Sequence, residues 1–265
     1  MFGNRNYGHG VRDAGQGDKS HSAYVGDAKR DNLSGRMPAV SGAGEGGASG
    51  VMRPGEDVSA LITRAAVFAA QAHKGQVYPD MNSPYFGHLE RVAKTAARIC
   101  DESKHRWQSQ PDRDSVVVLA YLHDVLEDTS VTCGDLESRF GTRIAESVLA
   151  MSKDEGINKE VRMMDSLFRI SSLRELRSET AIVKMADRIE NLEPYLLPNR
   201  EAPWYVRKRH AAEDYLKESQ LILAWSKRHY RGPGTRLLRE RLIDAWRHHE
   251  ERFPHRIDPW CDFSF

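Results

Sequence analysis

The run Tyr121-Leu-His-Asp-Val-Leu-Glu-Asp-Thr129 places four ionisable side chains within six residues of an otherwise apolar segment. On a continuous helix, His123 would share a face with Glu127, and Asp124 with Asp128, because residues four apart lie one above the other. A neutral imidazole beside a carboxylate is a common pair of ligands for a divalent metal. The second carboxylate pair could orient or deprotonate a water on that metal. The run therefore predicts part of a metal site whose other ligands come from elsewhere in the chain.

Helical periodicity dominates the sequence around this run. Apolar residues recur at helical spacing after Pro54, and no segment shows a convincing alternation of strand residues. Thr132 and Asp135 resemble a capping box, and Ser83 with Pro84 resembles an N-cap followed by proline at the first helical position. Helices are expected over residues 57–74, 84–99, 112–127, 132–140, 142–151, 159–176, 180–192 with Ser178 as its cap, 203–229 and 235–251. The sequence therefore predicts an all-α fold.

The composition narrows the class of protein. The net charge of +1 over 265 residues does not indicate a nucleic-acid binder, and no apolar run approaches the roughly 18 residues of a membrane span. Three widely separated cysteines (Cys100, Cys133 and Cys261) form no CxxC pair, which argues against a disulfide framework and fits a reducing cytoplasm. We expect a soluble cytoplasmic protein without a DNA, RNA or membrane partner.

The first 55 residues differ in composition from the rest of the chain. They are rich in Gly, Ser, Asp and Arg, and residues 41–50 have the composition of a linker. Such a segment buries too little apolar surface to offset the entropy lost on ordering. We expect a disordered Gly/Ser-rich tail over residues 1–55, while Met37 and Met52 leave a later translation start open.

Two further segments carry polar residues on apolar helix faces. His88 is in phase with Val92, where an unpaired imidazole would be costly. Asp187 lies on an apolar stripe with Ala186, and Asn191 follows one turn later on the same face as Asp187. Buried carboxylates are rarely left unpaired, so Asp187 needs a cation. Two histidines and two aspartates from three helices would suit Mn²⁺, Fe²⁺ or Zn²⁺.

Simpler structural roles are the alternative for each of these residues. Asp187 could pair with Lys184 or Arg188 as a surface salt bridge at helical spacing. Glu127 and Asp128 could merely terminate a helix. The order and spacing of the whole set favour the metal site over these separate explanations.

Five short motifs follow one another along the chain: Ala72-His-Lys-Gly-Gln76, Pro84-Tyr-Phe-Gly-His88, Leu122-His-Asp-Val-Leu-Glu-Asp-Thr129, Phe140-Gly141 and Val183-Lys-Met-Ala-Asp-Arg-Ile-Glu-Asn191. In this order they resemble the HD hydrolase domain of the RelA/SpoT-type alarmone enzymes. The resemblance covers about residues 57–220 and includes no block for a synthetase domain, so the chain is similar to a stand-alone small alarmone hydrolase. It implies an HD-domain helical bundle over residues 56–230, with additional C-terminal helices in an extension over residues 231–265.

The resemblance also implies an activity. It is that of a manganese-dependent 3′-pyrophosphohydrolase of (p)ppGpp, a purine nucleotide alarmone, which releases pyrophosphate and GDP or GTP. By their positions in the motifs, the implied metal ligands are His88, His123, Asp124 and Asp187, and the implied catalytic pair is Glu127 and Asp128. The candidates for contact with the substrate are Lys74, Tyr78, Lys153, Arg162, Lys184 and Asn191, with a packing role as the alternative for Lys184.

The chain departs from the family pattern around the expected substrate. Tyr78 stands where the family has an arginine that contacts the guanine, Glu190 stands where it has a histidine, and Glu193-Pro194 replaces a typical Arg-Thr pair. A tyrosine can stack on a purine but lacks the cationic fork that grips a base edge. Two alternatives therefore stay open. One is the same chemistry on (p)ppApp or NADPH, and the other is a non-catalytic nucleotide-binding regulator. The oligomeric state does not follow from the sequence.

Overall fold

The structure is a computed structural model that describes residues 57–78, 83–103, 111–159, 161–196 and 209–252. The predictions for the tail over residues 1–55 and for the start of the helix at Pro203 lie outside the described residues. None of the helices in these ranges is both long and apolar enough to cross a membrane.

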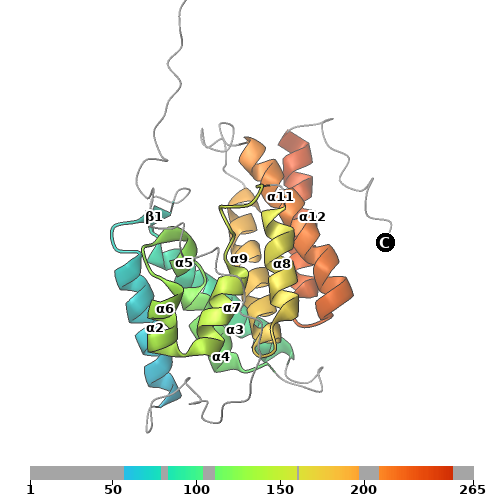
Figure 1. The fold of residues 1–265 in the computed structure, drawn as a ribbon. Helices are drawn as coiled ribbons and strands as arrows, with labels where there is room; N and C mark the ends of the chain where they lie inside the picture. The colour runs from blue at the N-terminus through green and yellow to red at the C-terminus, as the bar shows by residue number, and fades with distance from the viewer. Residues whose placement is uncertain (1–56, 79–82, 104–110, 160, 197–208, 253–265) are drawn as a thin grey trace, which may run out of the picture.

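Helices make up nearly all of the secondary structure in the described ranges (Figure 1). They are α2 (Val58–Ala72), α3 (Phe86–Ser103), α4 (Arg113–Leu122), α5 (Val125–Asp128), α6 (Cys133–Phe140), α7 (Thr142–Met151), α8 (Arg162–Ser172), α9 (Arg177–Leu196), α11 (Arg209–Trp225), the π-helical turn η1 (Ser226–Tyr230) and α12 (Thr235–Arg252). The prediction of an all-α fold is confirmed. The exception among these residues is one β-hairpin with two residues in each strand, β1 (Val77–Tyr78) and β2 (Ser83–Pro84).

The helix predicted to begin at Pro84 begins later. Tyr78 pairs with Ser83, and Val77 with Pro84, in antiparallel register. The backbone N–H of Tyr85 then donates to the carbonyl of Gln76 at 3.0 Å, which extends the hairpin by one more bond. Ser83 is therefore a strand residue and not an N-cap, because its backbone is committed to β1.

The helix predicted over residues 112–127 is interrupted. α4 ends at Leu122 and α5 starts at Val125, so His123 and Asp124 form a turn between them. The Asp124 carbonyl accepts hydrogen bonds from the N–H groups of Glu127 (3.1 Å) and Asp128 (2.9 Å) and starts the new turn. The predicted alignment of the two pairs on one straight helix is wrong.

The predicted helix ends and caps are confirmed at some positions and wrong at others. Thr132 and Asp135 form a complete capping box, and α7 occupies the predicted residues 142–151. Ser178 is not the cap of α9, which already starts at Arg177 after Leu176 turns into the left-handed region with a φ of 52°. The predicted helix over 159–176 is shorter because the backbone is extended at Leu173.

Helix α9 is the centre of the bundle. It packs against α3, α4, α7, α8, α11 and α12, and lies between the α2–α7 half and the α11–α12 pair in Figure 1. Residues 181–189 of α9 are all buried, although they include Lys184, Asp187 and Arg188. Each of these charged side chains therefore needs a partner inside the protein. α12 packs directly on α9, and the division into a domain over 56–230 and an extension over 231–265 stays a prediction.

Candidate active site

Three separate parts of the bundle bring His88, His123, Asp124 and Asp187 together. His88 lies in the first turn of α3, His123 and Asp124 form the α4–α5 turn, and Asp187 comes from α9. His123 Nε2 lies 2.9 Å from Asp124 Oδ2 and 3.6 Å from Asp187 Oδ1, and His88 Nε2 lies 3.7 Å and 3.4 Å from the same two oxygens. Ligand atoms 2.0–2.1 Å from one metal lie about 3.0–3.4 Å apart. The ligand atoms of His88, His123 and Asp124 all lie within 4.8 Å of one another, which fits a shared divalent ion, and Asp187 Oδ1 lies beside both histidines.

The protonation of His123 supports this fit. Its Nδ1 lies 2.8 Å from the carbonyl oxygen of Ala120, which can only accept, so Nδ1 carries the proton. The Nε2 atom of a neutral ring would then present a lone pair to the carboxylate oxygens of Asp124 and Asp187. Acceptors that face one another need a proton or a metal between them. A backbone bond that fixes the ring of a metal-binding histidine is common.

The charges of the cluster members shift the pKa values of His123 and Asp124. Burial opposes the charged form of His123, but the charge of Asp124 and the hydrogen bonds to Asp124 and Asp187 outweigh it and hold the pKa well above its usual range. Burial likewise raises the pKa of Asp124, but the charge of His123 prevails and lowers it to about 2. The centre of the cluster therefore favours positive charge.

Glu127 and Asp128 lie beside this cluster on α5. Glu127 Oε1 accepts a hydrogen bond from the backbone N–H of Lys153 at 2.9 Å. Burial raises the pKa of Glu127, and the charge of the buried Lys184 opposes this shift. Burial and the charge of Asp124 raise the pKa of Asp128. These carboxylates do more than terminate a helix, because they have specific partners and lie in a site that disfavours extra negative charge.

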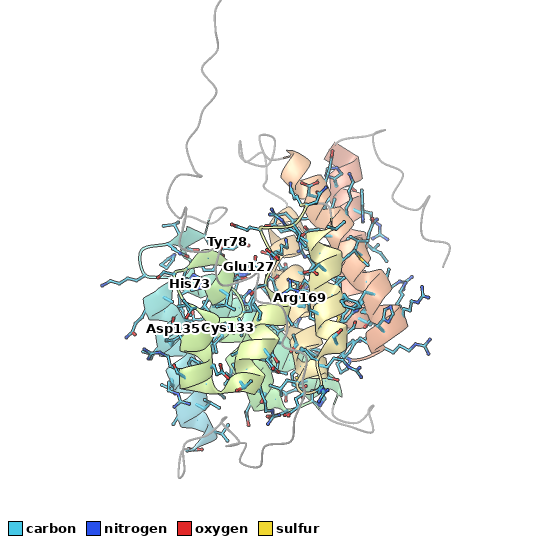
Figure 2. The ribbon with its side chains drawn as sticks, in the orientation of Figure 1. His73, Tyr78, Glu127, Cys133, Asp135 and Arg169 are labelled. Atoms are coloured by element: carbon cyan, nitrogen blue, oxygen red, sulfur yellow. The ribbon has the colours of Figure 1, made fainter. Side chains whose placement is uncertain are left out.

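Tyr85 connects the two carboxylate groups, a role that the sequence did not suggest. Its hydroxyl lies 2.6 Å from Asp124 Oδ2 and 2.8 Å from Asp128 Oδ2. Its ring stacks on the buried ring of His73 at 4.7 Å. Figure 2 shows His73 and Glu127 at the same end of the bundle. The one signal available in the sequence was the place of Tyr85 in the motif that ends at His88.

Tyr78 points into the protein. It is 7% exposed, and its ring stacks on His88 with 4.8 Å between the ring centres. Its hydroxyl donates to Asn191 Oδ1 at 2.7 Å, and Asn191 Nδ2 donates to Asp187 Oδ1 at 2.6 Å. The guanidinium of Arg91 lies over the Tyr78 ring at 5.5 Å. Tyr78 and Asn191 thus form a chain of contacts to the His/Asp cluster, and contact with a base stays a prediction.

The predicted substrate-binding cations do not form one cluster. Lys74 is exposed. Lys153 Nζ lies 3.1 Å and 3.3 Å from the carboxylate oxygens of Glu218. Arg162 donates to the carbonyls of residues 155 and 157 at 3.0 Å, so it holds that loop in shape. Lys184 is buried and donates to the carbonyl of Met151 at 2.9 Å. Their roles toward a substrate stay predictions.

The profile of the HD domain matches residues 65–213 of the chain. The chain belongs to the HD-domain family. This range contains His88, His123 and Asp124, whose ligand atoms lie close enough to hold a divalent metal, and it also contains the neighbouring Asp187.

Relatives of the HD domain come from animals and bacteria. The chain is 27% identical over 135 residues to guanosine-3′,5′-bis(diphosphate) 3′-pyrophosphohydrolase MESH1 of Danio rerio, covering 51% of this chain and 68% of the relative. It is 27% identical over 155 residues to MESH1 of Drosophila melanogaster, covering 57% and 78%. A probable guanosine-3′,5′-bis(diphosphate) 3′-pyrophosphohydrolase from Mycoplasma pneumoniae is 29% identical over 145 residues, but the match covers only 18% of its length.

One solved structure supports the HD fold. It is described as "A metazoan ortholog of SpoT hydrolyzes ppGpp and plays a role in starvation responses". It matches 70% of this chain and 93% of its own, with a TM-score of 0.51 and 21% identity. At this identity the likeness concerns the fold alone.

A buried ion pair joins the HD core to α11. Arg188, next to Asp187 on α9, is 2% exposed and donates to Glu218 Oε2 at 2.9 Å. Its guanidinium also lies 4.9 Å from the centre of the Tyr215 ring. Burial raises the pKa of Glu218, but the charges of Arg188 and Lys153 outweigh it and lower the pKa. The alternative of a surface salt bridge from Asp187 is wrong, because Asp187 is buried and faces His88 and His123.

Proposed function

We propose that this HD-domain protein is a cytoplasmic, manganese-dependent phosphohydrolase that removes the 3′-pyrophosphate of (p)ppGpp and leaves GDP or GTP. The observation that carries the proposal is the convergence of His88, His123, Asp124 and Asp187 beside Glu127 and Asp128. Two of the relatives are named as 3′-pyrophosphohydrolases of guanosine-3′,5′-bis(diphosphate) and cover about half of this chain. Fe²⁺ and Zn²⁺ suit the same nitrogen and oxygen ligands.

The four clustered residues would hold the ion, and the neighbouring side chains would handle protons. A bound divalent ion supplies a Lewis acid that lowers the pKa of a coordinated water and polarises a phosphoryl oxygen. Glu127 is suited to take a proton from the attacking water, because its raised pKa brings a carboxylate closer to neutral pH. The Lys153 N–H fixes the direction of Glu127 during that transfer.

Asp128 is the second group for this proton transfer. Its side chain is held by Tyr85, and its backbone carbonyl by Gln76 Nε2 at 2.6 Å. From this position it can orient the attacking water or protonate the leaving 3′-oxygen of the ribose. An in-line displacement needs both events, and positioning is the main contribution that a protein makes to phosphoryl transfer.

A second candidate is the same chemistry on another purine nucleotide, (p)ppApp or NADPH. The observation in its favour is Tyr78, which replaces the family's arginine and uses its hydroxyl on Asn191. Without a guanidinium at this position, discrimination between guanine and adenine loses one bidentate contact.

A substrate panel tests both candidates. The full chain, loaded with Mn²⁺, is given ppGpp, ppApp or NADPH, and the release of pyrophosphate or phosphate is measured. Rapid release of pyrophosphate from ppGpp is expected, and a higher kcat/KM for ppApp or NADPH would favour the second candidate. If calorimetry demonstrates metal binding but no substrate is turned over, the proposed enzymatic activity is contradicted. The remaining alternative is then a nucleotide-binding regulator.

A further inference from the structure

The hydroxyl group of Tyr85 contacts both Asp124 in the His/Asp cluster and Asp128 beside it. The oxygen of Asp124 that it contacts, Oδ2 at 2.6 Å, is the same oxygen that lies 2.9 Å from His123 Nε2 in the metal cluster. Its other contact, at 2.8 Å, is Oδ2 of Asp128, four residues further along the chain. The hydroxyl therefore lies at the junction between the metal ligands and the proton-transfer pair.

The two aspartates need such a donor. The side chain of Asp124 is mostly buried, at 15% exposed, whereas Asp128 is exposed, and the two carboxylates share one hydroxyl between their Oδ2 atoms. Like charges held this close repel each other. A hydroxyl has one proton, so Tyr85 can satisfy one oxygen at a time and is shared between them. Without it, the two carboxylates would lose the donor that they share, and Asp128 would lose its side-chain link to the cluster. The donor fixes where both oxygens point.

The surrounding residues hold Tyr85 in this position. Its ring lies nearly parallel to that of His73, with 8° between the planes. His73 Nδ1 lies 2.7 Å from Gln76 Oε1, and Gln76 Nε2 donates to the backbone carbonyl of Asp128 at 2.6 Å. The Tyr85 N–H donates to the Gln76 carbonyl. These contacts connect the end of α2, the β-hairpin and α5, so they restrict rotation of the Tyr85 side chain.

We propose that Tyr85 is a positioning residue that couples the metal ligand Asp124 to the proton-transfer residue Asp128. Its hydroxyl orients Asp124 Oδ2 toward the ion and Asp128 Oδ2 toward the reacting water. His73 and Gln76 are the support that keeps the hydroxyl between the two carboxylates. The part that concerns Asp128 rests on the proposed function, whereas the part that concerns Asp124 requires only that the site binds a metal.

The test compares Tyr85→Phe with Tyr121→Phe in the full chain. Tyr85→Phe removes the hydroxyl and keeps the ring that stacks on His73. Tyr121→Phe makes the same chemical change on α4, where the ring packs on Phe86 at 5.9 Å, outside the cluster. The readouts are the Mn²⁺ dissociation constant from calorimetry, the thermal midpoint of the metal-free protein, and kcat and KM on ppGpp at saturating Mn²⁺.

For Tyr85→Phe we expect Mn²⁺ binding to weaken by about tenfold or more, as for other partners of metal ligands. At saturating Mn²⁺, kcat should still fall by at least about tenfold while KM changes by less than about threefold, because Asp128 is no longer oriented. Tyr121→Phe should match the wild type in every readout. If Tyr85→Phe does not fold, Gln76→Met removes the support instead, and the same loss of kcat with little change in KM is expected.

Two results would overturn the proposal. One is a Tyr85→Phe protein with the wild-type Mn²⁺ affinity and kcat. The other is a variant that only melts earlier and regains full kcat and metal affinity at a temperature where it is folded, which would assign Tyr85 a structural role alone. If the wild type hydrolyses none of the substrates, the proposed function fails, and the Mn²⁺ affinities of the two variants still decide whether Tyr85 positions Asp124.

Discussion

The His/Asp cluster and the cations around it differ in how their charged side chains are paired. In the cluster, His123 Nε2 faces carboxylate oxygens of Asp124 and Asp187, and all of these atoms are suited to bind a cation. In the flanking region, Lys153 contacts Glu218, Lys184 contacts the carbonyl of Met151, and Arg188 contacts Glu218. The cluster therefore offers its nitrogen and oxygen atoms to a cation. The flanking cations already have internal oxygens, so a phosphate must compete with those oxygens to reach them.

The largest expected effect is at the metal ligands. Asp124→Ala removes the oxygen that meets His123, His88 and Tyr85. Mn²⁺ affinity should fall by more than about 100-fold, and turnover should fall to background. Removing a metal ligand is expected to weaken metal binding more than removing a residue that only hydrogen-bonds to a ligand. Calorimetry and pyrophosphate release measure the two effects. Asp101→Ala, at an exposed salt bridge with Arg113, is the control and should change neither. Retained metal affinity in Asp124→Ala would remove this residue from the cluster.

Glu127→Gln should separate metal binding from catalysis. The amide keeps the size of the side chain but cannot accept a proton, so kcat should fall by about 10²–10⁴ while Mn²⁺ affinity changes by less than about threefold. Glu146→Gln, on the exposed face of α7, serves as the matched control. Unchanged turnover in Glu127→Gln would exclude it as the proton acceptor.

Glu218→Gln tests whether the flanking cations depend on their internal anion. Arg188 would keep its buried positive charge without a full counter-charge, so the free energy of unfolding should fall by about 2 kcal/mol in urea titrations of the metal-free protein. Glu240→Gln breaks an exposed pair with Arg236 and should cost less than about 0.5 kcal/mol. Under the proposed function, KM should also fall, because Lys153 is released to meet substrate phosphate. Equal stability losses in the two variants would contradict the burial argument.

The smallest effect is expected at Tyr78. Tyr78→Phe removes the hydrogen bond to Asn191, which is worth about 0.5–1.5 kcal/mol, so kcat/KM should fall by about two- to tenfold. The loss should be similar for ppGpp and ppApp, because the hydroxyl is engaged by Asn191. Initial rates with the two nucleotides measure the ratio. A selective loss for one of them would mean that the hydroxyl contacts the base, and that this region reads the substrate directly.

Features that depend on neighbouring residues could be predicted from the sequence. The capping box at Thr132 and Asp135 and the bounds of α7 follow from local hydrogen bonds and apolar spacing. The membership of His88, His123, Asp124 and Asp187 in one group followed from their places in the motifs. The break between α4 and α5 did not, because apolar periodicity continues through it.

The sequence by itself determined the helical class, because apolar residues recur at helical spacing. It also determined which residue types can hold a metal, because this depends on the chemistry of single side chains. Only the tertiary structure decided the partners of those side chains. Tyr85 meets Asp124 and Asp128 across 39 and 43 residues, and Tyr78 meets Asn191 across 113. A buried polar group bonds to whatever the packed helices bring within about 3 Å. Spacing along the chain does not contain that information.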